Sequence, residues 1–192
     1  AHSGGQPMLY RRDAAMAAAA FMVEIEAAVR RAPERHRMTL TFGMMSAQPG
    51  WYSIVPGGAK ISFDLRSKSD AASRAMLGRI KKTLLRIEKK RGVKGRVKLS
   101  VKYAACPASM GIRRALKRAA GETEHSSLTL SSGGIHDACR IAALCPIGMV
   151  FVPSVKGLSH TPEEFTKFSD IVAGAEVMAS AILGLADRRV RA

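Results

Sequence analysis

Four side chains in this sequence stand where their chemistry suggests a function, and three of them are histidines. His160 lies in "GLSHTPEE", directly after a short apolar run and before acidic residues. His136 lies in "SSGGIHDA" and His2 lies in "AHSGGQP", both in loops built from small residues. Arg66 belongs to the polar set of an alternating stretch. An imidazole can bind a metal ion or carry a proton, and a guanidinium group suits a carboxylate.

The loop around His136 has two further features. Gly133 and Gly134 allow a ligand to approach the backbone, and their N–H groups are able to receive a carboxylate or an oxyanion. A metal site normally needs three or more nitrogen, oxygen or sulfur ligands. The spacing gives no HExxH, no HxD and no defined pair of carboxylates. The residues alone therefore predict candidate ligands in loops and not a complete site.

The elements that must position these side chains form a predicted α+β fold. Asp13 is expected to cap a helix over residues 13–31. The apolar stripe expected on this helix consists of Met16, Ala20, Val23 and Ala27. Strands are expected at 38–46 and 59–67, and the second places Ile61, Phe63 and Leu65 on one face.

A second helix is expected to begin at Ser69 or Asp70 and to end at Arg91, before Gly92. Residues 95–104, "GRVKLSVKYA", alternate as a half-buried strand does. If "AHS" ends an earlier strand, residues 1–103 follow the order strand, helix, strand, strand, helix, strand. This order predicts a ferredoxin-like sandwich with one antiparallel sheet and two helices on one face.

Residues 104–192 are predicted to form part of an α/β layer. Helices are expected near 109–120, 137–144 and 166–186, and short strands at 127–130 and 147–152. Three helices and two strands are too few for a complete doubly wound domain.

The chain has a formal net charge of +16, and much of this charge lies in one stretch. Residues 79–102 contain eleven Lys or Arg and one acid, Glu88. Such a surface can bind nucleic acid, but only Tyr103 supplies an aromatic ring nearby and no RNA-recognition motif is present. We interpret the stretch as a solvated outer face and expect no nucleic-acid partner.

Cysteine usage and hydropathy indicate the cellular setting. Cys106, Cys139 and Cys145 form no CxxC pair, and we expect them to be reduced, as in a cytoplasmic protein. Their apolar neighbours predict buried structural thiols. No apolar run reaches about 18 residues, so no membrane span is expected.

Four segments resemble, in order, the dinuclear-metal amidohydrolases of the aminoacylase/carboxypeptidase superfamily. The branch they resemble most contains N-carbamoyl-L-amino-acid amidohydrolase, β-ureidopropionase and allantoate amidohydrolase. The opening "AHSGGQPMLYRRDA" is similar to the family's "HAGTTPM..R.DA", and "PGWYSIVPGGAKISFDLR" to "P.A.NVIPG...F.LD.R". The segment "SGGIHDA" is similar to "SGAGHDA", and "PIGMVFVPSVKGLSHTPEEFT" to "P.GMIFVPS..GISH.P.E.T".

The resemblance implies a function and a set of roles. Family members hydrolyse a non-peptide C–N bond in an N-carbamoyl amino acid or a related ureido or amide acid, using two divalent metal ions such as Zn, Mn or Co. His160 is implied as a metal ligand, and His2 as the histidine that stabilises the oxyanion, often in the site of a neighbouring subunit. Arg66 is implied to hold the substrate carboxylate. The substrate pocket is implied to include Ser53, Gly133, Gly134 and His136.

The same resemblance implies two domains. Residues 1–103 correspond to a lid and dimerisation domain, through which a homodimer is expected. Residues 104–192 correspond to the carboxy-terminal portion of a metallopeptidase-like catalytic domain. Ser53 replaces the family's asparagine, and Gly5 and Gln6 replace its two threonines. The family's HxD ligands, bridging aspartate, glutamate pair and "H.EQG" histidine have no counterpart here, so this chain alone is expected to be inactive and to need a separate amino-terminal half.

Two other classes of function stay open at this point. The chain is compatible with a non-catalytic dimerisation or binding module derived from such an enzyme. The basic stretch 79–102 is compatible with a nucleic-acid-binding domain, although we favour the hydrolase.

Overall fold

The computed structural model describes residues 1–33 and 38–190 of the 192-residue chain, so His36 lies outside the described residues. The chain divides into two compact units, Ala1–Ala105 and Cys106–Ala192. The division lies two residues from the boundary that the sequence predicts. We describe each unit by itself.

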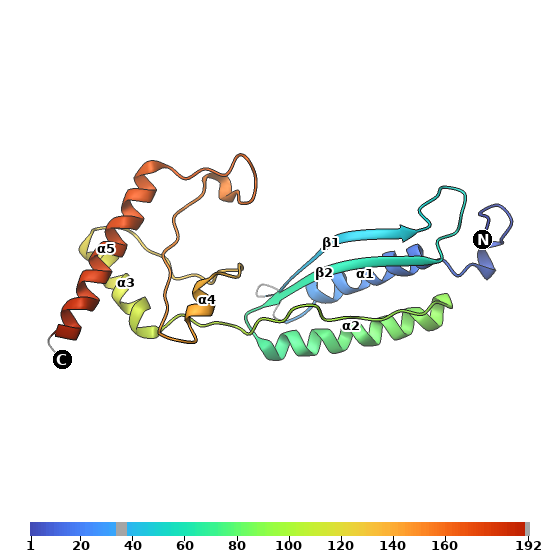
Figure 1. Ribbon diagram of the computed structural model, residues 1–192, viewed down its shortest axis with the longest axis horizontal. Coiled ribbons are helices and arrows are strands. Elements are labelled where there is room, and N and C mark those ends of the chain that lie inside the picture. Colours follow the sequence, from blue (N-terminus) through green and yellow to red (C-terminus); the bar gives the residue numbers. More distant parts are fainter. Residues whose placement is uncertain (34–37, 191–192) are drawn as a thin grey trace. The chain divides into compact units, whose positions relative to one another are not determined.

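The first unit is a strand hairpin covered on one face by two helices (Figure 1). Strand β1 (Met38–Gln48) pairs antiparallel with β2 (Gly58–Ser67). Helix α1 (Ala14–Arg30) precedes the hairpin and α2 (Asp70–Arg91) follows it, and both pack on the strands. A short 3-10 helix, η1 (Met8–Tyr10), lies before α1.

Capping residues define the ends of α1 and α2. The Asp13 carboxylate accepts a hydrogen bond from the Met16 amide at 3.0 Å, and the Ser69 hydroxyl accepts one from the Ala72 amide at 3.2 Å. Each cap satisfies an amide that has no partner inside the helix and stabilises it by about 1 kcal/mol. Gly92 ends α2 at φ 64°, a left-handed conformation that glycine adopts without steric cost. The predicted caps are confirmed.

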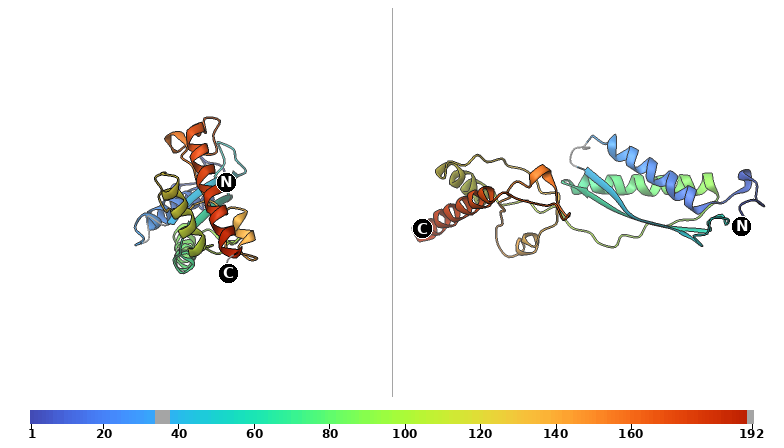
Figure 2. Two further views of the ribbon diagram at one scale, coloured as in Figure 1. Left: turned by 90° about the vertical axis from the view of Figure 1, so that its left-hand side faces the viewer. Right: turned by 90° about the horizontal axis from the view of Figure 1, so that it is seen from above.

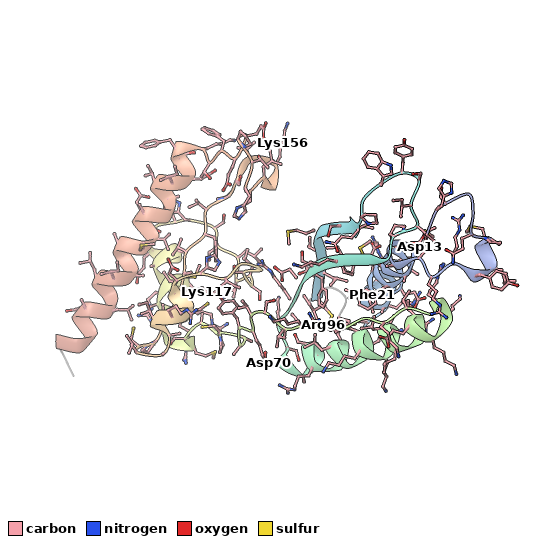
Figure 3. All side chains as sticks on the ribbon, turned by 45° about the vertical axis from the view of Figure 1, so that its right-hand side comes forward. Asp13, Phe21, Asp70, Arg96, Lys117 and Lys156 are labelled. Carbon is pink, nitrogen blue, oxygen red and sulfur yellow. The ribbon has the colours of Figure 1, made fainter. Side chains whose placement is uncertain are left out.

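The first unit has its own apolar core. Ile25 of α1 and Ile80 of α2 are 1% and 0% exposed, and Phe21 lies with them between the helices and the strands (Figure 3). The predicted stripe on α1 is wrong for Met16 and Val23, which are exposed. Because this alanine-rich helix is apolar nearly all round, its periodicity does not select one face. The bulky Phe21 and Ile25 turn to the core instead.

The four-stranded sheet expected for residues 1–103 is not present, because the described residues form a sheet of two strands. The predicted strand 95–104 does not join the sheet of the described residues, and its start contacts the core through Val97. The predicted first strand is reduced to one bridge, between His2 and Ile54. In the expected topology the last strand lies beside the first, so the reduction of the first strand to one bridge leaves no adjacent strand for 95–104 in the described sheet.

The second unit contains two long helices and little else that is regular. Helix α3 (Met110–Glu122) packs on α5 (Phe168–Val190), as both views of the unit show (Figures 1 and 2). The expected helix 137–144 is shorter, with α4 at Ala138–Ile141, and a 3-10 turn, η2, occupies Val155–Gly157. Residues 127–130 and 147–152, predicted as strands, belong to no sheet in the described part of the chain. The α+β class is confirmed.

Helix α5 is more apolar than the sequence analysis expects, which predicted no stretch apolar enough to span a membrane. Residues Phe168–Asp187 have a mean hydropathy of 1.5, and by length and composition this stretch is apolar enough to cross a membrane. Among the side chains described in this unit, the fully buried apolar ones are three alanines, Ala119, Ala120 and Ala181. Thus most large apolar side chains of α5 are accessible to solvent.

Candidate functional site

His2 and Ser53 come together at one end of the β1–β2 hairpin. The Ser3 amide donates to the Ser53 carbonyl at 2.8 Å, next to the bridge between His2 and Ile54. The His2 Nδ1 atom accepts a hydrogen bond from the Gly4 amide at 3.1 Å. A shallow, open depression nearby is lined by Ala1, Pro49, Ile54 and their neighbours and includes neither predicted residue, so we assign it no role.

Arg66 lies near the other end of the same hairpin. It is eight residues along β2 from Gly58, a separation of about 27 Å in an extended strand. Its guanidinium donates to the Asp64 carboxylate from Nε at 3.0 Å and from Nη2 at 2.7 Å. This hydrogen bond and the charge of Asp64 raise the pKa of Arg66, so the group is cationic at any physiological pH. The hairpin therefore separates Arg66 from His2.

The glycine loop of the second unit brings His136 against Ser132. The Ser132 hydroxyl lies 2.5 Å from His136 Nε2, and it also accepts a hydrogen bond from the Gly134 amide at 3.0 Å. A Cβ atom at Gly134 would lie 3.2 Å from the same imidazole nitrogen, so glycine keeps the loop closed around the ring. No atom would lie within 4 Å of a Cβ at Gly133. Sequence reasoning missed Ser132, although it stands four residues before a histidine in a turn.

The His136 ring also contacts an aromatic ring. Its centroid lies 5.6 Å from that of Phe151 in an edge-to-face arrangement. Phe151 belongs to the extended segment 147–152, so this contact ties the glycine loop to that segment. The contact between the His136 and Phe151 rings helps to hold the glycine loop in place.

His160 occupies a strained position in the loop that joins η2 to α5. Its φ is 59°, in the left-handed region that residues other than glycine rarely adopt. Its amide donates to the Glu164 carboxylate at 2.7 Å. The Ser154 hydroxyl, directly before η2, donates to the carbonyl of Leu158, the first residue of this loop, at 2.6 Å. Lys156, also at positive φ, lies in η2 just before this loop and is labelled in Figure 3. The imidazole itself is exposed, so it is accessible to a ligand.

The described residues do not form a metal site by themselves. Over residues 1–33 and 38–190, no three His, Cys, Asp or Glu side chains lie close enough to hold one ion. In the same part of the chain, no hydrogen bond or ring contact joins His160 to His136. A metal held here needs ligands in addition to those of the described side chains.

The three cysteines are free thiols, as predicted, but they are not all buried. Cys145 is exposed, and Cys106 and Cys139 are half-buried. Partial burial and a hydrogen bond with Cys139 raise the pKa of Cys106. A raised pKa lowers the thiolate fraction, so we assign Cys106 no catalytic role.

Comparison with known proteins agrees with the motifs. Residues 4–184 match the family model "Peptidase family M20/M25/M40". An N-carbamoyl-L-amino-acid amidohydrolase of Paenarthrobacter aurescens is 32% identical over 92% of this chain and 42% of its own length. Allantoate amidohydrolase of Escherichia coli is 26% identical over 96% of this chain and 44% of its own.

Solved structures give the same result. An amidase of the hydantoinase/carbamoylase family from Burkholderia vietnamiensis has a TM-score of 0.87 and 30% identity over 96% of this chain and 44% of its own. The chain therefore spans less than half the length of these relatives. A match over nearly all of its residues nevertheless shows that the chain belongs to peptidase family M20/M25/M40.

Proposed function

We propose that this chain is the carboxy-terminal part of a metal-dependent amidohydrolase. Its reaction is hydrolysis of a non-peptide C–N bond in an N-carbamoyl amino acid or a related ureido or amide acid. The observation that carries this proposal is the agreement of four ordered motifs with relatives named as N-carbamoyl-L-amino-acid and allantoate amidohydrolases. The activity belongs to the complete enzyme, and the residues below are this chain's contribution to it.

Arg66 binds the substrate carboxylate in this proposal. Its guanidinium is planar and permanently charged, and it presents N–H donors in a geometry that matches a carboxylate. Asp64 holds the group on the exposed side of β2 and raises its pKa. A substrate with one carboxylate, such as an N-carbamoyl amino acid, fits this site.

His2 stabilises the developing oxyanion in this proposal, but in the site of a second copy. His2 lies beside Ile54, before the start of β2, and Arg66 lies eight residues along β2 from Gly58, about 27 Å in an extended strand. A small substrate bound to Arg66 is therefore not expected to reach His2 of the same unit. Two copies paired through residues 1–103 resolve this conflict, since each supplies its His2 to the other. Ser53, beside His2, then reaches the same pocket.

The second unit contributes the remaining contacts. His160 supplies one imidazole ligand to a divalent ion such as Zn, Mn or Co, and Gly133, Gly134 and His136 line the substrate pocket. A bound ion supplies Lewis-acid activation of water in hydrolases of this kind. Because the described side chains do not complete the ligand set, we derive no catalytic step through the metal.

The test uses this chain joined to the amino-terminal part of an N-carbamoyl-L-amino-acid amidohydrolase relative. Arg66→Ala removes a charge-assisted, two-point contact, so KM for an N-carbamoyl-L-amino acid should rise about 10- to 100-fold. Arg74→Ala, which changes an exposed arginine of α2, is the matched control and should leave KM unchanged. An unchanged KM in Arg66→Ala would refute the role of this arginine.

A second candidate function is a non-catalytic dimerisation module. It is favoured by the separate core of the first unit and by the incomplete ligand set in the described chain. Sedimentation velocity distinguishes it, because a module of this kind must dimerise without any complementing segment. A monomer at all concentrations would exclude this alternative.

A further inference from the structure

The outer side of α2 carries positive charge and no exposed acid. Over Asp70–Arg91, all of which the structure describes, the exposed residues are four uncharged ones and seven cations. The two acids of this helix, Asp70 and Glu88, are half-buried, and Glu88 accepts a hydrogen bond from the Gly95 amide. The uncharged residues are Ala71, Ala75, Gly78 and Leu85, and the cations are Arg74, Arg79, Lys81, Lys82, Arg86, Lys89 and Lys90. We call these exposed residues the cationic face.

The seven cations share one side of the helix. At about 100° per residue they fall within roughly 180°, and the buried Met76, Ile80 and Ile87 lie on the opposite side. From Arg74 to Lys90 the cationic face is about 24 Å long. Side chains that end in nitrogen point from α2 away from the strands (Figure 3). The charge is therefore presented to the outside along most of the helix.

The pattern of charge on this face is unfavourable for the helix by itself. Lys82 lies three residues after Arg79 and four before Arg86, and these spacings place like charges side by side. Within the described part of the chain, one of the seven cations forms an ion pair, between Arg86 and Glu24 of α1. A helix face that only meets solvent commonly alternates charges of both signs, which support one another. A face of cations without exposed acids fits an anionic partner instead.

Nucleic acid does not match the shape of this face. The major groove of a duplex is about 12 Å wide and admits a single helix, but α2 lies beside α1 on the strands and so cannot enter a groove (Figure 1). Single strands are held by aromatic side chains that stack on the bases, and the exposed residues of α2 include no aromatic ring. The partner must therefore be recognised by its charge over a broad surface.

Leu85 adds an apolar group to the cationic face. Its side chain is 64% exposed, and it lies three residues after Lys82 and four before Lys89. At an anionic bilayer, the headgroups attract lysine and arginine, and the boundary with the acyl chains beneath them accepts an apolar side chain. A row of cations with a leucine among them matches these two layers.

We propose that the cationic face of α2 binds the surface of an anionic lipid bilayer. The charged groups of the lipids attract the seven cations, and Leu85 enters the headgroup layer. The contact is peripheral, because α2 stays packed on the first unit through its buried side. The inference is independent of the proposed function, since no residue of the cationic face has a role in substrate or metal binding.

The experiment measures co-sedimentation of the full chain with lipid vesicles. Vesicles of phosphatidylcholine that contain about 30% phosphatidylserine are compared with vesicles of phosphatidylcholine alone, at an ionic strength of about 0.1 M. We expect binding to the anionic vesicles to be at least about tenfold stronger. This binding should disappear as the ionic strength rises toward about 1 M, where the screening length falls to about 3 Å.

Paired charge variants locate the contact. Lys82→Gln combined with Lys89→Gln should weaken binding to anionic vesicles about 25-fold, at roughly fivefold for each charge removed. Lys117→Gln combined with Arg118→Gln is the matched control, because these exposed cations lie on α3 of the second unit and the net charge changes by the same amount. The control should weaken binding by less than about twofold. Circular dichroism and thermal unfolding verify that each variant keeps its fold.

A pair of leucine variants tests the apolar contact. Leu85→Ala should weaken binding to anionic vesicles about threefold or more, because the smaller side chain gains less in the headgroup layer. Leu144→Ala is the matched control, since Leu144 is 85% exposed and lies in the second unit. It should leave the binding unchanged.

Four results would overturn the proposal. These are equal binding to the two kinds of vesicle, equal weakening by the two pairs of charge variants, unchanged binding in Leu85→Ala, and tighter binding to duplex DNA than to anionic vesicles at the same ionic strength. The last result would identify nucleic acid as the partner of the cationic face.

Discussion

The loop that presents His160 gives a prediction whose size follows from the structure. The residue sits at φ 59°, which costs a residue other than glycine about 1 kcal/mol or more. The hydrogen bond from its amide to the Glu164 carboxylate, 2.7 Å long, offsets this cost. A hydrogen bond to a charged group that is shielded from solvent stabilises the folded state by about 1.5–3 kcal/mol. Because this loop is exposed, we take a stabilisation of about 1.4 kcal/mol for the bond to Glu164.

Glu164→Ala should therefore release the turn. By the relation of about 1.4 kcal/mol to a factor of ten, the His160 amide should exchange with solvent about tenfold faster than in the unchanged chain. The assay is amide exchange of His160 followed by NMR at fixed pH and temperature. Glu164→Gln keeps an uncharged acceptor and should give an intermediate rate.

Glu163→Ala is the matched control for this experiment. Glu163 is an adjacent exposed acid that forms no hydrogen bond or ion pair in the part of the chain that the structure describes. Its removal should leave the His160 amide unchanged. Equal exchange rates in the unchanged chain and in Glu164→Ala would refute the claim that Glu164 holds the loop around His160 in shape.

Three further predictions concern stability, thiol chemistry and the basic surface. Ile80→Ala, at a fully buried position, should lower the free energy of unfolding of the first unit by about 2–5 kcal/mol in urea titrations, and Leu85→Ala by about 0.5 kcal/mol or less. Iodoacetamide at pH 8 should modify exposed Cys145 faster than Cys106, because the raised pKa of Cys106 reduces its thiolate fraction. Cys139→Ala should speed the modification of Cys106. Both rates are measured by mass spectrometry of the peptides, and faster modification of Cys106 than of Cys145, or no change in Cys139→Ala, would contradict this. The outer side of α2 is a solvated cationic face without aromatic rings. Fluorescence anisotropy should therefore show only weak binding of duplex DNA, which disappears as the salt concentration rises through about 0.2 M. Tight binding with an affinity independent of salt concentration would contradict this.

Features set by neighbouring residues could be predicted from the sequence. Asp13, Ser69 and Gly92 satisfy or end their helices through contacts within a few residues, and each was predicted. The strand 95–104 was not predicted correctly, because pairing depends on a distant partner that alternation of residues does not reveal. The buried face of α1 was also missed, since alanine is compatible with either side of the helix.

The candidate site was predictable in its parts and not in its arrangement. The motifs place Arg66 and His2 in one unit, but their separation follows from strand direction and length. The contact between Ser132 and His136 depends on how the glycine loop folds back, which composition alone does not show. For His160, the exposed ring agrees with a ligand, whereas a ring packed in an apolar interior would have contradicted that role.

The most direct test of the account is the metal content of the protein after dialysis against Zn²⁺ and removal of free ion. The account predicts far less than one tightly held Zn²⁺ per molecule for this chain alone, because one imidazole cannot retain the ion. It predicts close to two for the chain joined to the amino-terminal part of a relative, and a large loss in His160→Ala. Two firmly bound ions in the chain alone, or full retention in His160→Ala, would contradict it.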